Sequence, residues 1–205
     1  MNIIPNVKLL ECSSVRTAIY AGLVCTDSED KIENYTNDFI KNLISSGHES
    51  VIEHINYTFE LDGISRALLQ ELARHRHISL SVKSTRWALK RTSSKHGLSY
   101  YNVKQNLNFD TKHEDFIILE AAKNEYLSKI NEIINKQQLP NDILKYYMIE
   151  SLQTKAILSL NARELRLIFS LRTSSRALKE FRDLCKLIYE SLPERHKFMY
   201  DEFFN

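Results

Sequence analysis

Hydrophobic and polar positions recur along this chain with two different periods, which predict both strands and helices. Apolar and polar residues alternate over 55–61 and again over 78–83, a period of two that is typical of strands with one buried face. Residues 7–11 favour a further short strand, and the polar stretch 91–112 is expected to be a mobile loop. Apolar residues at helical spacing predict helices over residues 14–24, 31–46, 113–136, 141–158 and 162–191.

Residues with turn or capping preferences mark where several of these elements end. Gly47 stands where the left-handed C-terminal cap of the second predicted helix belongs. Asp62-Gly63 is expected to close the strand before it, and Ser65 is expected to cap a helix that runs to about Arg74. The sequence therefore predicts an α+β fold with more helix than strand.

The composition of the 205 residues is that of an ordinary globular domain, with 43% hydrophobic and 26% charged residues. Gly and Pro number only 4 and 3, so no flexible or polyproline linker is visible, and residues 1–205 are expected to form a single domain. Lys and Arg number 28, and Asp and Glu 26. A net charge of +2 does not predict a protein that binds nucleic acid or a membrane surface.

Cysteine usage and the N-terminal residues favour a cytoplasmic protein. Cys12, Cys25 and Cys185 are odd in number and far apart, and no C-x-x-C spacing occurs, which is typical of reduced intracellular chains. The first residues lack the charged-then-apolar pattern of a signal peptide. No apolar run approaches the ~20 residues that cross a bilayer, so no membrane span is expected.

The strongest chemical signal is the segment RHRHISLSVKSTRW, which extends from Arg74 to Trp87. An Arg side chain presents a planar fork of donors that binds phosphate oxygens in pairs, and the serine hydroxyls add further donors. The segment therefore favours an anion-binding site. The alternative is a solvated basic edge whose charges pair with acids elsewhere in the chain.

This segment resembles the signature of the flavin-dependent thymidylate synthases, in which R-H-R is followed after seven residues by S. The matching residues are Arg74, His75, Arg76 and Ser84, followed by Arg86. The resemblance implies that the R-H-R segment and the adjoining His77 bind FAD, and that the later Ser and Arg contact dUMP. Val82 stands where the family usually has Glu or Gln, and Trp87 where it has Tyr.

A second match is GHESVIEH at residues 47–54, which resembles the family's segment before its first long strand. The resemblance implies that His48, Ser50 and Glu53 border the flavin, with His48 orienting flavin and folate. Taken alone, these residues would be a helix-end His and a turn Ser. The histidines at 48, 54, 75 and 77 lack the usual spacing of zinc ligands, so no metal site is predicted.

A third match covers residues 161–184, which resemble the family's C-terminal helix. The resemblance implies that Asn161 and Arg163 contact FAD and that Arg172 holds dUMP. Asn161 also has an ordinary structural explanation, because an Asn with Glu164 three residues later is a variant of the helix capping box.

Weaker matches complete the predicted site. Cys25 stands where the family places a small polar residue near FAD, although a buried cysteine is the simpler explanation. Asp142 and Lys145 stand where the family has an acid and an Arg beside the nucleotide, and Glu71 stands where members carry Gln or Glu near dUMP.

The resemblance implies a fold with a small antiparallel sheet flanked by several long helices, and a complete reaction. The enzyme would convert dUMP to dTMP, with methylenetetrahydrofolate as carbon donor and NADPH-reduced FAD as hydride source. Family members are homotetramers whose sites use several subunits. The implied catalytic residues are His48, Ser84 and Arg172. The implied substrate contacts are Glu71, Ser84, Arg86, Lys145 and Arg172.

Two other functions stay open on the sequence. Four departures from the family pattern fall at substrate or flavin positions. One of them is Arg176, which is expected to lie one helical turn beyond Arg172. The four are Val82, Lys145, Leu167 and Arg176. They could indicate another pyrimidine nucleotide or a hydroxymethyl product. A helical nucleic-acid-binding protein that uses the Arg-rich segment and Tyr100-Tyr101 is the third hypothesis, and the near-neutral net charge argues against it.

Overall fold

Within the residues that the computed structural model describes, 4–106 and 111–204, four strands form one small antiparallel sheet. The strand order is β1-β2-β4-β3. The strands are β1 (Asn6–Cys12), β2 (Asn56–Ser65), β3 (Ile78–Val82) and β4 (Gln153–Asn161). Helices outnumber strands along the chain, and the predicted α+β class is confirmed.

The chain divides into two compact units. The first, named here the α6 unit, comprises Met1–Ile4, Asp62–Gln70 and Val82–Lys155. The second, named here the α8 unit, comprises Pro5–Leu61, Glu71–Ser81 and Ala156–Asn205. The long strands β2 and β4 contribute residues to both units.

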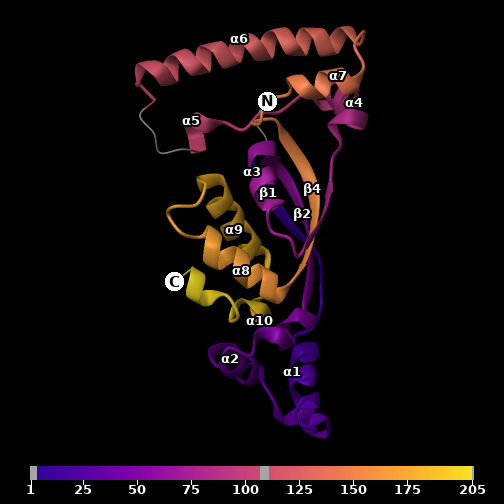
Figure 1. Ribbon diagram of the computed structural model, residues 1–205, viewed down its shortest axis with the longest axis vertical. Coiled ribbons are helices and arrows are strands. Elements are labelled where there is room, and N and C mark those ends of the chain that lie inside the picture. The colour runs from indigo at the N-terminus through magenta and orange to yellow at the C-terminus, as the bar shows by residue number, and fades with distance from the viewer. Residues whose placement is uncertain (1–3, 107–110, 205) are drawn as a thin grey trace. The chain divides into compact units, whose positions relative to one another are not determined.

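The α8 unit packs helices around an aromatic core. Its helices are α1 (Val15–Val24), η1 (Glu29–Asn34), α2 (Asn37–Ser45), η2 (Glu49–His54), α8 (Ala162–Arg172), α9 (Lys179–Ser191), α10 (Glu194–Lys197) and η4 (Asp201–Phe203). Helices α8 and α9 lie side by side (Figure 1). The large aromatic side chains that are fully buried are Tyr57, Phe59, Phe169, Phe181 and Tyr200.

The α6 unit has its own core under the long helix α6 (Glu114–Lys136). Its other helices are most of α3 (Arg66–Leu72), α4 (Thr85–His96), α5 (Val103–Asn106), α7 (Asn141–Leu144) and η3 (Lys145–Tyr147). Helix α4 packs against both α6 and α7 (Figure 1), and the buried cluster consists of Leu89, Leu98, Ile130, Ile134, Leu144 and Leu152. No helix in the described ranges combines the length and the apolar character needed to cross a membrane.

Several local predictions are confirmed because short-range chemistry determines them. The Oγ atom of Ser65 accepts a hydrogen bond from the backbone N–H of Leu68 at 3.0 Å, as an N-cap should. Gly47 has a φ of 80°, and the N–H groups of Gly47 and His48 donate back to Ile44 and Leu43. This is the left-handed helix end for which glycine is preferred. Strand β1 and helices α1 and α6 also fall where they were predicted.

The single helix predicted over 141–158 is wrong, because helical structure ends with the short α7 and η3 and residues 153–158 belong to the strand β4. The burial of β4 alternates strictly: Thr154, Ala156, Leu158 and Leu160 are buried, and the residues between them are half-buried. The short apolar run in this segment suits either period, so the pattern does not decide between helix and strand. Pairing with β2 and β3 on its two sides decides it.

Four further boundaries differ from the predictions. The helix predicted at 31–46 is divided, since Thr36 caps α2 by accepting a hydrogen bond from Asp38 N at 3.3 Å. The helix predicted at 162–191 is divided between α8 and α9. Asp62-Gly63 does not end β2, because Gly63 continues the strand at a φ of 78°. The expected loop 91–112 begins inside α4, and its residues 107–110 lie outside the described ranges.

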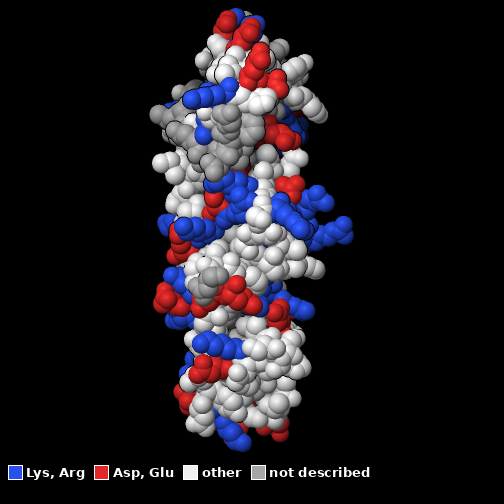
Figure 2. Space-filling model, turned by 90° about the vertical axis from the view of Figure 1, so that its left-hand side faces the viewer, with Lys and Arg blue, Asp and Glu red and all other residues white. Residues whose placement is uncertain are grey.

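Basic and acidic side chains are mixed on the surface. On the face drawn in Figure 2, Lys and Arg side chains lie beside Asp and Glu side chains along much of the molecule. Several oppositely charged side chains of the surface form ion pairs, such as Arg16 with Glu33 at 2.5 Å and Lys155 with Asp62 at 2.9 Å. This mixing is in keeping with the net charge of +2.

A buried polar cluster in the α8 unit makes its stability depend on pH. His196 is completely buried, and its Nδ1 lies 2.9 Å from the hydroxyl of Tyr57, which accepts a hydrogen bond from the Tyr200 hydroxyl at 3.1 Å. The Tyr57 hydroxyl therefore donates to Nδ1, which must be unprotonated. Burial, with a smaller effect of Arg195, lowers the pKa of His196 from 6.5 to about 4.

We expect the free energy of unfolding to fall by about 2 kcal/mol between pH 7 and pH 5 through His196 alone. The direction follows from the lowered pKa of His196. Its contribution to the free energy of unfolding is present above pH 6.5 and is lost as the pH falls toward 4. Urea denaturation at several pH values measures it. His196→Gln should make the dependence shallower, whereas His54→Gln, at an exposed position, should not. An unchanged slope in His196→Gln would contradict the assignment.

Candidate functional site

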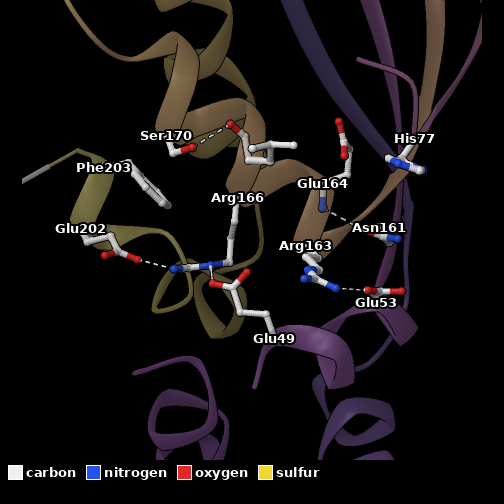
Figure 3. Close-up of a pocket in the computed structure, with 11 residues that line it drawn as sticks. Glu49, Glu53, His77, Asn161, Arg163, Glu164, Arg166, Ser170, Glu202 and Phe203 are labelled. Atoms are coloured by element: carbon white, nitrogen blue, oxygen red, sulfur yellow. Dashed lines mark hydrogen bonds and ion pairs between the residues drawn. The ribbon is translucent and has the colours of Figure 1, made fainter. Parts of the chain in front are cut away.

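A pocket of about 780 Å³ opens in the α8 unit, and residues far apart in the sequence line it (Figure 3). They come from η2, from the turn before β3, from the end of β4, from α8 and from η4. The lining residues are Glu49, Glu53, His77, Asn161, Arg163, Glu164, Arg166, Leu167, Ser170, Glu202 and Phe203. The structure thus brings four of the predicted flavin contacts together, namely Glu53, His77, Asn161 and Arg163.

The N-terminus of α8 supplies one side of the pocket. The Oδ1 atom of Asn161 accepts a hydrogen bond from the N–H of Glu164 at 2.9 Å, so the predicted helix cap is present. Arg163 reaches across to Glu53, with 2.6 Å between Nη1 and Oε1, and this hydrogen bond raises the pKa of Arg163. Both side chains are about half exposed, at 53% and 45%. An exposed pair contributes only about 0–1 kcal/mol, so an anionic ligand can compete for Arg163.

Arg166 lies one helical turn further along and is buried instead of exposed. Its Nε is 3.0 Å from Glu49 and its Nη2 is 2.5 Å from Glu202, and Nη1 donates to the carbonyl oxygen of Met199. The guanidinium also lies over the ring of Phe203, 5.2 Å from its centroid. Only 10% of the Arg166 side chain is exposed. Arg166 therefore joins η2, α8 and the C-terminal segment into one wall of the pocket (Figure 3).

His75 connects the Arg-rich turn to the interior of the α8 unit. Its Nε2 accepts a hydrogen bond from Arg172 Nε at 3.2 Å, and its Nδ1 lies 3.4 Å from the carboxylate of Glu164. Arg172 also donates from Nη1 to Glu71 at 3.0 Å. Burial, and then the charge of Arg172, lowers the pKa of His75, while burial raises the pKa of Glu164. Segments 71–75 and 164–172 are thus in direct contact.

The remaining predicted flavin contacts are exposed side chains of the same unit. Arg74 and Arg76 point from the turn before β3, and Nη1 of Arg74 is 4.0 Å from Glu71. His48 and Ser50 are exposed at the start of η2, the element that supplies Glu49 and Glu53 to the pocket. None of these four side chains is among those that line the pocket. Their predicted roles stay predictions.

The other predicted substrate contacts lie in the α6 unit. Ser84 caps α4, since its Oγ accepts a hydrogen bond from Trp87 N at 3.4 Å. Arg86 follows in the first turn of α4, and its Nε is 2.8 Å from Asp142 Oδ1 at the start of α7. Lys145 begins η3 and is exposed. The side chains of Arg86 and Asp142 are each about 60% exposed, so the guanidinium of Arg86 is accessible to an anion.

Three details of the sequence interpretation are corrected. Arg176 is not one helical turn beyond Arg172, because α8 ends at Arg172 and the backbone N–H of Arg176 donates to Ser174 in the following turn. Cys25 is exposed at the end of α1 instead of buried, and its thiol donates to Ala21 O at 3.3 Å. The apolar side chains of β3 are only half-buried, as is usual at the edge of a sheet.

Sequence reasoning missed four charged residues of the pocket, of which Glu164 and Arg166 are buried. Glu49, Glu164, Arg166 and Glu202 all line it, and neither their spacing nor a motif distinguishes them from surface residues of helices. The only available signal was the three-residue spacing of Arg163 and Arg166, which places both on one helical face. In the described ranges, no group of three or more His, Cys, Asp or Glu side chains is arranged to hold a metal ion.

Comparison with known proteins covers nearly the whole chain. A family model described as "Thymidylate synthase complementing protein" matches residues 8–196. The flavin-dependent thymidylate synthase of Campylobacter jejuni strain RM1221 is 41% identical over 157 residues, which cover 75% of this chain and 73% of the relative. The enzyme of the same name from Helicobacter pylori strain J99 is 36% identical over 160 residues, covering 76% of each chain.

A solved structure agrees with these sequence matches. The crystal structure of Thymidylate Synthase X from Helicobacter pylori, with FAD and dUMP, superimposes with a TM-score of 0.79 at 31% sequence identity. The match covers 98% of this chain and 99% of that one. The superimposed residues therefore include both units and the segments that border the pocket.

Replacing Arg166 should destabilise the protein far more than replacing Arg163. Arg166→Met leaves Glu49, 28% exposed, and the more exposed Glu202 without their shared cation, and each lost hydrogen bond between charged groups costs about 1.5–3 kcal/mol. Arg163→Met is the matched control, because it removes an exposed pair worth under about 1 kcal/mol from the same helix. Urea denaturation in the absence of ligands measures both. Equal losses in the two variants would show that Arg166 has no special structural role.

Proposed function

Because the chain belongs to the flavin-dependent thymidylate synthase family, we propose that it converts dUMP to dTMP with FAD as cofactor. Methylenetetrahydrofolate supplies the carbon and NADPH supplies the reducing equivalents. The observation that supports the proposal best is the pocket of the α8 unit, where η2, the residue after the R-H-R segment and the start of α8 meet. These are the three segments that the family uses for its flavin.

The residues of the pocket suit a ligand that carries both phosphates and hydroxyl groups. Arg163 and His77 offer donors to phosphate oxygens, and the exposed Arg74 and Arg76 add positive charge in the turn beside His77. The carboxylate of Glu53 can accept hydrogen bonds from hydroxyl or amino groups once Arg163 turns to the ligand. The volume of about 780 Å³ is within the usual range for small-molecule sites. The donor set therefore fits FAD.

In the reaction, the reduced flavin supplies the hydride, and the protein supplies placement and charge. Arg172 binds dUMP and stabilises the negative charge that develops on the pyrimidine. Glu71 restrains the Arg172 guanidinium from one side, with 3.0 Å between the paired atoms. His48 orients the flavin and the folate, and Ser50 contacts the cofactor.

In the α6 unit, Ser84, Arg86 and Lys145 contact dUMP. Arg86 offers a guanidinium that Asp142 already orients, which reduces the number of side-chain conformations lost on binding. Lys145 provides a point charge where the family has an Arg, so it attracts an anion without the paired geometry of a guanidinium. Ser84 serves as a substrate contact.

We also propose that the chain acts as a single domain, in homotetramers whose sites use several subunits, in the cytoplasm. Strands β2 and β4 pass through both units, and the family match at 8–196 spans both, which supports one functional domain. Helix α6 exposes three consecutive apolar side chains, Ile117, Ile118 and Leu119, that an interface would cover. The three cysteines are free, in keeping with a reducing compartment.

The purified protein should bind FAD, and dUMP should accelerate its oxidation of NADPH. With a deuterated reductant, the hydride delivered by the flavin should appear in the methyl group of dTMP. Absorbance at flavin wavelengths, NADPH consumption and mass spectrometry of the nucleotide measure these results. A protein that cannot be loaded with FAD would overturn the proposal. A hydroxymethyl product would show that the protein uses the proposed cofactor for a different reaction.

Two charge-removing variants should separate cofactor binding from substrate binding. Arg163→Met should raise the Kd for FAD, and Arg86→Met should raise the KM for dUMP, each about 10- to 100-fold. A hydrogen bond to a charged group is worth about 1.5–3 kcal/mol, which gives that range. Lys179→Met, which removes an exposed pair with Asp183 on α9, is the control and should change neither value by more than about twofold. If Arg163→Met leaves the FAD affinity unchanged, Arg163 does not bind the cofactor.

A further inference from the structure

We propose that Glu164 and His75 are positioning residues that hold the guanidinium of Arg172 in the orientation needed to bind dUMP. The inference rests on the proposed function, in which Arg172 binds the nucleotide. It also gives His75 a different task from its neighbours Arg74 and Arg76. The imidazole acts through Arg172 and not through its own contact with the flavin.

The three side chains form a continuous chain of contacts in the α8 unit. Arg172 Nε donates to His75 Nε2 at 3.2 Å, and His75 Nδ1 faces Glu164 Oε1 at 3.4 Å. The side chains of His75 and Glu164 are each only 5% exposed, and that of Arg172 is 20% exposed. The two supporting side chains are therefore more buried than the guanidinium that they hold.

The protonation of the imidazole follows from its partners. A guanidinium has five N–H donors and no acceptor, and it stays charged in proteins. Nε2 of His75 must therefore accept the hydrogen bond from Arg172, and the ring proton must be on Nδ1, facing Glu164. Both ring nitrogens are occupied in this way. The imidazole has no ring nitrogen left to bind a phosphate or a flavin atom.

A buried aromatic ring restrains the same two side chains from another direction. The guanidinium of Arg172 lies 4.9 Å from the centroid of Phe181. The His75 ring meets Phe181 edge-to-face, with 5.9 Å between centroids and an angle of 77°. Phe181 is fully buried and cannot readily move. The plane of the guanidinium is thus held by His75, by Phe181 and, through Nη1, by Glu71.

This restraint has a catalytic purpose because Arg side chains lose much rotational freedom when they bind a ligand. Immobilising a long side chain costs about 0.5–1.5 kcal/mol, and a guanidinium that is already held does not incur that cost on binding. The hydrogen bonds from Nε and Nη1 use two of the five donors within the described residues, so the others are available to the nucleotide. Losing the support should therefore weaken dUMP binding selectively.

The decisive experiment replaces His75 in two ways and measures two ligands. His75→Leu removes the acceptor for Arg172, and we expect the KM for dUMP to rise about tenfold, since a hydrogen bond to a charged group is worth about 1.5 kcal/mol or more. The Kd for FAD should stay within about twofold. His75→Gln can place an amide oxygen near the position of Nε2, and it should restore most of the dUMP affinity. A direct flavin contact predicts the opposite result, with FAD affinity lost in both variants.

A variant at the far end of the chain of contacts tests the same inference without changing the imidazole. Glu164→Gln keeps the size of the side chain and removes its charge, and we expect a smaller rise in the KM for dUMP than in His75→Leu. Because Glu164 also lines the pocket proposed for FAD, this variant is assayed with FAD at saturation and only the KM for dUMP is compared. If His75→Leu does not fold, Glu164→Gln and His75→Gln decide the matter. An unchanged KM for dUMP in Glu164→Gln, or a fall in FAD affinity in His75→Gln, would overturn the positioning role.

Controls separate this inference from the proposed function. The unaltered protein and Glu33→Gln, which removes an exposed pair with Arg16, must both bind FAD and form dTMP. If the unaltered protein does neither, the proposed function fails, whatever the variants do. If it does both and the variants show no selective effect on dUMP, only the positioning role fails.

Discussion

The pairing of the arginines of α8 with carboxylates from distant parts of the chain is the constraint on which the α8 unit depends. A charge removed from water must be paired or it destabilises the fold by several kcal/mol. The two more buried Arg side chains of this helix, Arg166 and Arg172, therefore determine where η2, the end of α3 and the C-terminal segment can lie. The pairs are Arg163 with Glu53, Arg166 with Glu49 and Glu202, and Arg172 with Glu71.

These arginines differ in burial, and the difference separates structural from functional roles. Arg166 is 10% exposed and is surrounded by protein partners, so it belongs to the framework. Arg163 is 53% exposed and has one exposed partner, so a ligand can replace that partner. Arg172 is intermediate at 20%, held by protein groups on several sides yet not enclosed. One helix thus carries both the support of the pocket and the accessible groups that are proposed to bind its ligands.

The sequence motifs locate much of the candidate site, but they do not explain how it is held together. Glu53, His77, Asn161 and Arg163 are identified from motif spacing and do line one pocket. Their roles toward a ligand rest on the family. The buried positions of Glu164 and Arg166 escape the motifs, because a buried charge and a surface charge on a helix look the same in a sequence. The R-H-R motif places His75 with the flavin contacts, and only its neighbours in the folded chain reveal the link to Arg172.

The sequence alone determined the local features that depend on residues close together in the chain. These include the caps at Ser65 and Asn161, the glycine turn at Gly47 and the alternation of β3, because each arises from interactions within a few residues. The tertiary structure decided what depends on distant partners. The run that became β4 was compatible with helix or strand until its neighbours in the sheet selected the strand. The exposure of each arginine likewise depends on carboxylates from distant parts of the chain. No local sequence pattern shows which arginine will pair with which carboxylate.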